Sequence, residues 1–247
     1  MGLLSPDDIA RLHDASLDLL ETVGVKMDQP TVVGKLAQAG ADVNPDGVTV
    51  RIPRALVAQC LEGAPRNIRL ADRRGNLVHV GADGGTVFWG GNAMYLARGR
   101  ERVEITSRDL ADITRLNDAL PRVHAVVGAS IADYPPIVRD FIGFRVMAEH
   151  STKHIRPVIF SPDGPLAILE MAEVLASGHS LSEHPIVSFG YSIVSPLHWS
   201  RTALDLFLRT SGYGIPMMVN SEPLAGGTAP VTLAGLLAQA NAEALSG

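Results

Sequence analysis

Residues 185–221 decide the fold class, and they read PIVSFGYSIVSPLHWSRTALDLFLRTSGYGIPMMVNS. The stretch begins with an apolar run (185–192) and ends with another (215–221), and both runs have the length of a buried strand. The segment between them, LHWSRTALDLFLRTSG, has a helical pattern and ends at Gly212, a residue type that commonly stops helices. Two apolar strands joined by a helix are typical of a right-handed βαβ unit, so the stretch predicts parallel strands.

The same alternation extends back along the chain. Apolar runs at 124–130 and 155–161 predict two more strands, and TVFWGG (86–91) predicts the first of the series. Helical patterns separate and follow the strands, in ITSRDLADITRLNDAL, PPIVRDFIGFRVMAEHS, PLAILEMAEVLASG and VTLAGLLAQANAEALSG. We count about five βα units, which indicates the α/β class with a parallel sheet. A TIM (β/α)₈ barrel needs eight strands, so this count fits either a smaller open sheet or a truncated barrel.

Residues 1–80 have a different pattern. LSPDDIARLHDASLDLLETVGV predicts a helix with Ser5 as its cap, Pro6 at its first position and Gly24 as its stop. Two shorter helices (PTVVGKLAQAGA and PRALVAQCLEG) flank VTVRIP, which alternates like a strand. LADRRGNLVHVGADGGTVFWGG predicts two strands around an Arg-Gly and an Asp-Gly-Gly turn. We therefore expect an N-terminal mixed helical and β subdomain at 1–80 and the βα units at 81–247.

Composition excludes several classes of function. The net charge is −5 and Lys and Arg do not cluster, so binding to nucleic acid or to an anionic membrane is not expected. No apolar run reaches the ~18 residues of a membrane span, and the start of the chain lacks a signal-peptide pattern. The single cysteine, Cys60, suits a reducing cytoplasm, and we expect it at a buried apolar position of its helix. These features predict a cytoplasmic protein.

Sequence motifs for several common chemistries are also absent. No strand–helix junction carries GxGxxG or GxxxxGK[ST], which excludes the common dinucleotide and P-loop signatures. The sequence has no GxSxG elbow, no HExxH and no zinc spacing, so no metal site is expected. The DxHxxG loop by which cobalamin is usually bound is missing too.

The best place for a ligand is the carboxyl end of the parallel strands, because loops converge there and helix N-termini point inward. The loops at these positions are small, hydroxylated or proline-containing and poor in cations, which favours a small organic ligand over a polyphosphate. They are WGGNAMY, GASIADYPP, FSPDGP, GYSIVSPLHW and NSEPLAGGTAPVT.

Individual residues in these loops are candidates for ligand contact, each with a plain structural alternative. Glu222 ends a strand, and the segment Gly226, Gly227 and Thr228 has N–H groups suited to a ligand; the alternative is a solvated loop. Asn92 follows two glycines that permit close approach, or is a turn residue. The remaining candidates are His198, which follows a strand, and three aromatic residues that suit either a cage for a methylated cation or the core: Trp89, Tyr95 and Tyr191.

Two histidines lie at the opposite, amino ends of the strands. Lys153 and His154 begin one strand, and His124 begins another. In a barrel this end contributes to stability, so we expect these side chains to satisfy local hydrogen bonds. The residues alone name no catalytic group.

Five segments, taken together and in order, resemble the trimethylamine methyltransferase family, which includes glycine betaine methyltransferases. They are LSPDDIARLHDASLDLLETVGV, VTVRIPRALVAQCLEGAPRNIRLADR, SRDLADITRLNDALPRV, VSFGYSIVSPL and AGGTAPVTLAGLLAQANAEALSG. The resemblance implies a TIM barrel with an N-terminal appendage. It also implies methyl transfer from trimethylamine, glycine betaine or a similar amine to the Co(I) corrinoid of a separate protein, so that no cofactor is bound directly. The aromatic faces and Glu222 would then bind the cation.

Members of that family are about twice as long, so the resemblance implies an N-terminal portion with a truncated barrel and leaves any pyrrolysine position outside the chain. If Gly247 is the true end, exposed strand edges predict self-association into a homo-oligomer. Two alternatives remain open. One is a non-catalytic protein of this fold that binds a betaine-like ligand or serves in assembly. The other is an unrelated barrel lyase or aldolase, which would need a lysine at the carboxyl end of a strand, and none of the five has one.

Overall fold

The computed structural model describes residues 3–81 and 84–247 and confirms the mixed α/β class. The chain divides into two units, and each is considered by itself. Unit 1 combines Met1–Ala64, Tyr191–Phe207 and Val219–Gly247, whereas unit 2 combines Pro65–Gly190 and Leu208–Met218. The predicted Asp-Gly-Gly turn begins at residue 83 and therefore lies partly outside the described residues.

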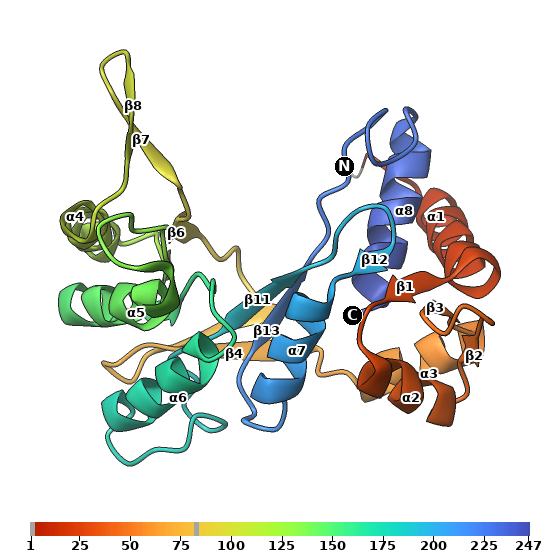
Figure 1. The fold of residues 1–247 in the computed structure, drawn as a ribbon, viewed down its shortest axis with the longest axis horizontal. Coiled ribbons are helices and arrows are strands. Elements are labelled where there is room, and N and C mark those ends of the chain that lie inside the picture. The colour runs from red at the N-terminus through yellow and green to blue at the C-terminus, as the bar shows by residue number, and fades with distance from the viewer. Residues whose placement is uncertain (1–2, 82–83) are drawn as a thin grey trace. The chain divides into compact units, whose positions relative to one another are not determined.

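Unit 2 contains parallel strands, of which Figure 1 labels β6, β11 and β13. Three of them make one parallel sheet in the order β10-β9-β6, and Val187 continues the series through a parallel bridge to Ile155. Beyond it, β11 pairs with β13, and the Phe189 N–H donates to the Pro216 carbonyl over 3.2 Å. All five predicted strands are present but shorter: β6 (Trp89–Gly91), β9 (Ala125–Val127), β10 (His154–Arg156), β11 (Phe189–Ser192) and β13 (Met217–Asn220).

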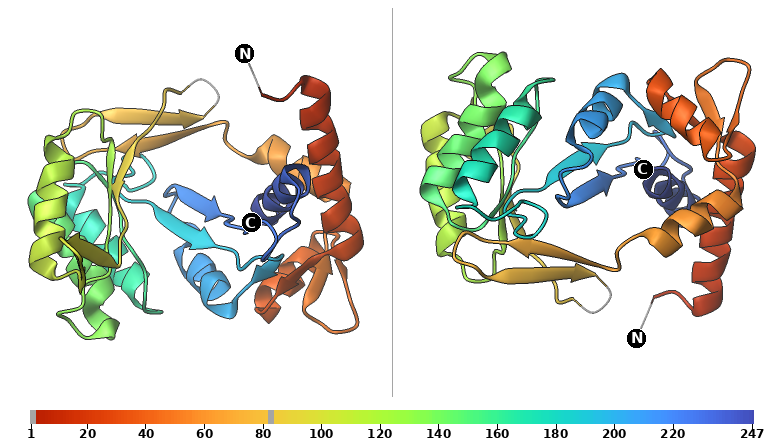
Figure 2. Two further views of the ribbon diagram at one scale, coloured as in Figure 1. Left: turned by 90° about the horizontal axis from the view of Figure 1, so that it is seen from above. Right: turned by 90° about the horizontal axis from the view of Figure 1, so that it is seen from below.

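Three helices cover one face of this sheet. They are α4 (Ser107–Ala119), α5 (Arg139–His150), which follows the 3-10 turn η2 (Pro136–Val138), and α6 (Gly164–Leu175). Helix α5 packs between α4 and α6, and Figure 2 shows the three as a layer beside the strands. Helix α4 is capped by Thr106 in a capping box: the Thr106 hydroxyl accepts from the Asp109 N–H, and the Asp109 carboxylate accepts from the Thr106 N–H.

Two hairpins mark opposite ends of the parallel strands. The first consists of β4 (Asn67–Ala71) and β5 (Leu77–Gly81), joined through the predicted Arg-Gly turn. It closes the amino ends, because the Ala71 N–H donates to the carbonyl of Pro185 before β11 and the Arg73 N–H donates to that of Thr152 before β10. The second hairpin, β7 (Tyr95–Arg98) with β8 (Glu101–Glu104), follows the carboxyl end of β6 and was not predicted.

Unit 1 is built on a small mixed sheet in the order β12-β1-β3-β2. Strand β1 runs parallel to β12 and antiparallel to β3. The helix predicted over LHWSRTALDLFLRTSG begins only at Arg201, because His198 and Trp199 form β12 and pair with β1 instead. The strands are β1 (Val25–Met27), β2 (Asp42–Val43), β3 (Thr49–Arg51) and β12 (His198–Trp199).

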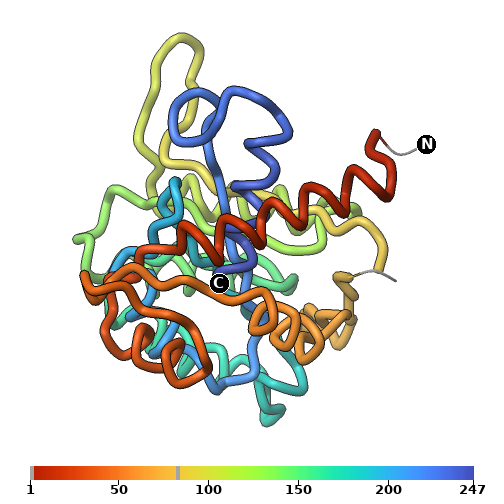
Figure 3. The backbone as a smooth tube through the Cα atoms, turned by 90° about the vertical axis from the view of Figure 1, so that its right-hand side faces the viewer, coloured from red at the N-terminus to blue at the C-terminus, as the bar shows by residue number. Residues whose placement is uncertain are grey.

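Five helical elements accompany this sheet. As predicted, Ser5 caps α1, Pro6 is at its first position and the chain turns away at Gly24, whose φ is +84°; the structure adds that Asp8 completes a capping box with Ser5. Helix α1 packs against α8. Figure 3 shows α1, in red, crossing the blue C-terminal segment. Cys60 is exposed on α3, so the buried position predicted for it was wrong. The elements are α1 (Pro6–Asp18), η1 (Leu19–Val23), α2 (Pro30–Gln38), α3 (Arg54–Gly63) and α8 (Leu233–Leu245); α7 (Arg201–Thr210) starts in unit 1 and ends in unit 2.

Candidate functional site

The two faces of the parallel sheet in unit 2 have different neighbours. Gly90 faces helix α4, because a side chain there would meet Asn117, whose Oδ1 lies 1.8 Å from an ideal Cβ position. Ile155 shares the register level of Gly90 and therefore the same, helix-covered face. Since side chains alternate along a strand, Trp89 and His154 point to the opposite face. That opposite face carries two layers of side chains, one toward each end of the strands.

The layer nearer the amino ends is a closed polar network around His154. Its imidazole is 1% exposed, Nδ1 lies 2.9 Å from the Pro185 carbonyl oxygen, and Nε2 lies 2.8 Å from Ser188 Oγ. Burial lowers the pKa of His154 to about 4, so the ring is neutral, with Nδ1–H donating and Nε2 accepting from Ser188. The Trp89 ring meets the imidazole edge-on at a centroid distance of 5.8 Å. The predicted structural role of His154 is confirmed.

The layer nearer the carboxyl ends combines small residues with one cation. The register aligns Gly91, Val127 and Arg156, and the parallel bridge between Ile155 and Val187 places Ser188 at the same level on the neighbouring strand. The Arg156 guanidinium lies directly over Gly190, since an added Cβ would fall 1.9 Å from Arg156 Nη2. Gly91 is equally restricted, because its φ is +113° and a Cβ would fall 2.2 Å from the Val127 carbonyl oxygen. The carboxyl end therefore presents a guanidinium that lies over Gly190, beside the closely packed Gly91.

A buried carboxylate fixes the loop that follows Arg156. Asp140, at the start of α5, is 1% exposed, and its Oδ2 accepts from the N–H groups of Phe160 and Ser161 over 3.0 and 2.8 Å. The same oxygen accepts the Ser161 hydroxyl over 2.9 Å, while Oδ1 is buried without a hydrogen-bond partner among the described residues. The carboxyl-end loop after β10 is thus tied to the helix layer.

Comparison with known proteins identifies the family to which this chain belongs. A family model described as trimethylamine methyltransferase (MTTB) matches residues 1–247. The chain belongs to the trimethylamine methyltransferase family. This confirms the resemblance found in the sequence.

Several curated relatives and solved structures are similar to this family member. The trimethylamine methyltransferase MttB of Desulfitobacterium hafniense (strain DSM 10664 / DCB-2) is 28% identical over 246 residues, covering 98% of this chain and 50% of the relative. A glycine betaine methyltransferase of D. hafniense (strain Y51) is 25% identical over 253 residues, covering all of this chain and 52% of the relative. The chain therefore spans about half the length of the curated relatives it matches.

The Methanosarcina barkeri monomethylamine methyltransferase (MtmB) structure shares the fold. It has a TM-score of 0.54 at 13% sequence identity, covering 97% of this chain and 56% of that chain. Among the described residues, no helix is both long and apolar enough to cross a membrane.

Three of the family member's predicted ligand contacts lie in unit 2. Trp89 is half-buried against His154, in the layer below Arg156. Asn92 is exposed immediately after Gly91 and has a left-handed φ of 69°. Tyr95 is 41% exposed on β7, where the Arg102 guanidinium carbon lies 4.3 Å from its ring centroid. Trp89 and Asn92 thus lie next to the carboxyl-end layer along β6. The Tyr95 ring, in contrast, is already in a cation–π contact with the Arg102 guanidinium.

Two further predicted contacts lie in unit 1. Tyr191 is 4% exposed and packs edge-on against Phe207 at a centroid distance of 6.3 Å. His198 lies in β12 rather than at a helix N-terminus, and its Nε2 is 2.6 Å from Asp28 Oδ2. The hydrogen bond from His198 lowers the pKa of the Asp28 carboxyl. Both predicted side chains therefore have partners within their own unit.

The loop with the remaining predicted contacts bonds mainly to itself. Glu222 is exposed, as its structural alternative stated. The Gly226 N–H donates to the Ala229 carbonyl over 2.9 Å, and the N–H groups of Gly227 and Thr228 both donate to the Leu224 carbonyl over 3.0 Å. The Thr228 hydroxyl accepts from the Leu224 N–H. In this structure the three N–H groups suited to a ligand are used inside the loop.

Sequence reasoning missed Glu243, the centre of a polar cluster in unit 1. It is fully buried on α8 and accepts the hydroxyls of Ser195 and Ser221 over 2.7 and 2.6 Å. The Leu197 N–H and the Gln239 amide complete its shell at 3.1 and 2.9 Å. Four donors satisfy this carboxylate, so it joins three segments of unit 1. A lone acid in a helical pattern gives no sequence signal for such a role.

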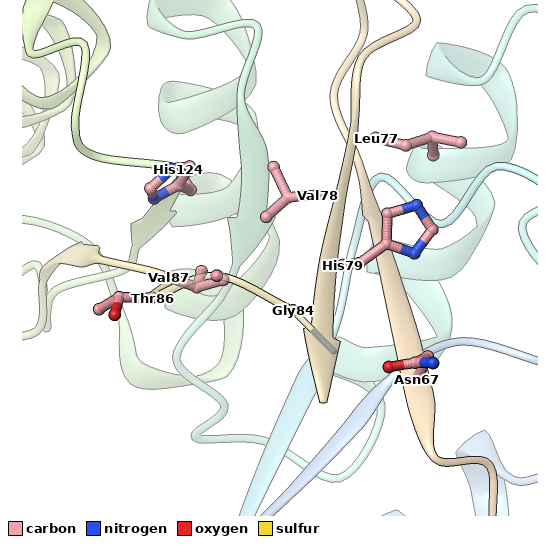
Figure 4. A pocket seen from close by; sticks show the side chains of 9 residues that line it. Asn67, Leu77, Val78, His79, Gly84, Thr86, Val87 and His124 are labelled. Carbon is pink, nitrogen blue, oxygen red and sulfur yellow. The ribbon is translucent and has the colours of Figure 1, made fainter. Parts of the chain in front are cut away.

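A pocket of about 490 Å³ lies on the amino-end side of unit 2, lined by Asn67, Leu77, Val78, His79, Gly84, Gly85, Thr86, Val87 and His124. Figure 4 shows that its two histidines do not converge, because His79 points away from His124 across the β5 strand. His124 Nδ1 accepts the Phe88 N–H over 3.1 Å, which confirms the predicted local hydrogen bond. Within 3–81 and 84–247, no group of three His, Cys, Asp or Glu side chains is arranged to hold a metal ion.

Proposed function

We propose that this chain is part of a methyltransferase that removes a methyl group from a methylated amine and passes it to the corrinoid of a separate protein. Family membership over residues 1–247 is the observation that carries the proposal. Relatives named for trimethylamine and for glycine betaine both match along nearly the whole chain, which supports a methylated amine as the substrate class. The corrinoid partner and the absence of a directly bound cofactor are inferences from the family.

The fold supports the next part of the proposal, that the five parallel strands belong to a (β/α)₈ barrel. Strands β6, β9 and β10 are adjacent in chain order, helices cover one face of their sheet, and side chains form layers on the other face, as in a barrel interior. We further propose the N-terminal subdomain at 1–80, the barrel portion at 81–247, a cytoplasmic location and self-association. In a barrel the carboxyl-end layer of β6, β9 and β10 faces the substrate.

The proposed reaction requires little acid–base catalysis by the protein. The partner's corrinoid supplies the nucleophile that accepts the methyl group. When a quaternary ammonium loses a methyl, the C–N bond electrons stay on nitrogen, so the amine leaves neutral and needs no general acid. The chain's task is to hold the N–CH₃ bond in line and to exclude water. Rigid supports such as the Asp140 loop anchor suit that task.

The test is methyl transfer by the protein expressed from its complete reading frame. It is incubated with a reduced corrinoid protein and either trimethylamine or glycine betaine, and the demethylated amine is followed by NMR. We expect one amine to lose a methyl in step with methylation of the corrinoid. If both amines persist while a known methyltransferase methylates the same corrinoid protein, the proposal fails. Binding of glycine betaine without transfer would instead support the non-catalytic alternative.

A further inference from the structure

We propose that Glu243 is a positioning residue, which holds two carboxyl-end loops of unit 1 in the arrangement that binds the substrate. The inference rests on the proposed function and deepens it, because it assigns the group that keeps the ligand-binding loops in place. Glu243 is fully buried, so it acts through the loops and not by contact with the substrate.

The two loops follow neighbouring strands. The Ile193 N–H, just after β11, donates to the carbonyl of Asn220, the last residue of β13, over 3.0 Å. The loop after β11 contains Ser195 and Leu197, and the loop after β13 begins at Ser221. In α/β folds, ligands bind at such carboxyl-end loops. The second loop also carries four of the predicted ligand contacts, which are Glu222, Gly226, Gly227 and Thr228.

Glu243 bonds to both loops at once. Its Oε2 accepts the hydroxyls of Ser195 and Ser221 over 2.7 and 2.6 Å, and its Oε1 accepts the Leu197 N–H over 3.1 Å. A single carboxylate oxygen therefore joins the first loop to the second. The residue after Ser221 is Glu222, which is exposed. A shift of Ser221 would consequently move the carboxylate expected to face the cation.

Gln239, one helical turn earlier on α8, extends this support to the far end of the second loop. Its amide nitrogen donates to Glu243 Oε1 over 2.9 Å and to the Thr228 carbonyl oxygen over 2.8 Å. Two buried side chains of one helix thus hold the loop at Ser221 and at Thr228. Fixed support of this kind is what a preorganised binding site requires.

Loss of this support has a specific kinetic consequence. A loop released from Glu243 populates other arrangements, and the apparent affinity for the substrate falls with the fraction of protein in the binding-competent one. Saturating substrate orders the loop again, so the rate of transfer at saturation changes little. A positioning role therefore predicts a raised KM with kcat retained. Loss of folded protein alone would instead lower the apparent kcat and leave KM unchanged.

The experiment compares Ser221→Ala and Glu243→Ala with a matched control, in the protein from its complete reading frame. The control is Ser16→Ala, at a buried hydroxyl whose hydrogen-bond partners lie on α1 and α8. Methyl transfer to a reduced corrinoid protein is measured with trimethylamine and with glycine betaine. For the amine that the parent demethylates, we expect KM to rise roughly 10-fold in Ser221→Ala and roughly 100-fold in Glu243→Ala. We expect kcat to stay within about twofold of the control.

Amide hydrogen exchange follows the loop directly and does not depend on activity. The N–H groups of Leu224 and of 226–229 are bonded within the loop. We expect these amides to exchange faster in Ser221→Ala and Glu243→Ala than in Ser16→Ala. If Glu243→Ala does not fold, Ser221→Ala decides alone, because three donors still satisfy the carboxylate in that variant.

The outcomes separate the two proposals. A Ser221→Ala variant with the KM and the loop exchange of Ser16→Ala would overturn the positioning role, and so would a fall in kcat with KM unchanged. If the parent demethylates neither amine, the proposed function fails and the exchange measurement decides this inference. Faster loop exchange in Ser221→Ala than in Ser16→Ala would then keep Glu243 as the residue that holds the loop, and equal exchange would reject it.

Discussion

The two ends of the parallel strands in unit 2 share one sheet but differ in chemistry. At the amino ends, His154 is buried, neutral and hydrogen-bonded at both ring nitrogens, and the β4–β5 hairpin closes the strands. At the carboxyl ends, Arg156 lies among glycines and a valine. Polar groups at the first end satisfy one another, and the second end carries the Arg156 guanidinium over Gly190. We therefore infer that the amino ends contribute to stability, and we propose that a ligand binds at the carboxyl ends.

The largest expected effect is at the amino end. His154→Ala removes a buried ring and leaves carbonyl and hydroxyl groups without their partner, so we expect a loss of about 3 kcal/mol in the free energy of unfolding. Urea denaturation measures it, and Ser188→Ala is the control with an expected loss of about 1 kcal/mol. A His154→Ala variant with parental stability but no ligand affinity would reverse the roles assigned to the two ends.

The anchor of the carboxyl-end loop comes next. Asp140→Ala strips the acceptor from two backbone N–H groups and a hydroxyl, so we expect a loss of about 2 kcal/mol. Asp140→Asn keeps one acceptor oxygen and should cost clearly less. Both are measured by urea denaturation. Equal losses in the two variants would show that a neutral side chain of the same shape and with one acceptor oxygen does not hold the loop, and would contradict this account.

Acid should weaken the amino end specifically. The folded-state pKa of His154 is about 4 and the usual value is about 6.5, so between these pH values the unfolded chain binds a proton that the folded chain does not. Stability is therefore fully present above pH ~6.5 and falls with decreasing pH by up to about 1.4 kcal/mol per pH unit. Urea titrations at several pH values test this, with His154→Gln as the control. A parallel pH dependence in parent and control would contradict a neutral His154.

The smallest effect on stability is expected at the carboxyl end. Arg156 is half-buried and Gln retains part of its length, so Arg156→Gln should change the free energy of unfolding by less than about 1 kcal/mol. The same urea experiment checks it. A loss as large as that of His154→Ala would mean that Arg156 holds the sheet together and would remove the contrast between the two ends.

Elements with a local sequence pattern could be predicted from the sequence. The roles of residues whose partners lie far away in the chain could not. The strand and helix periods of the βα units are local, so all five strands were predicted. His198 looked like a helix start, but pairing with Lys26, far away in the chain, makes it part of a strand. Arg156 gave no motif, because its place in the sheet follows only when the faces of the sheet are known. Buried polar centres such as Glu243 depend on donors from several segments and carry no local pattern.

The most direct test of the contrast is an amide NMR titration of the protein with glycine betaine. We predict that the shift changes cluster at the carboxyl ends of the strands, at 90–92, 128–130, 156–158 and 190. Changes clustered instead at the amino ends, around 71–73, 152–154 and 185, would contradict the assignment of the two ends.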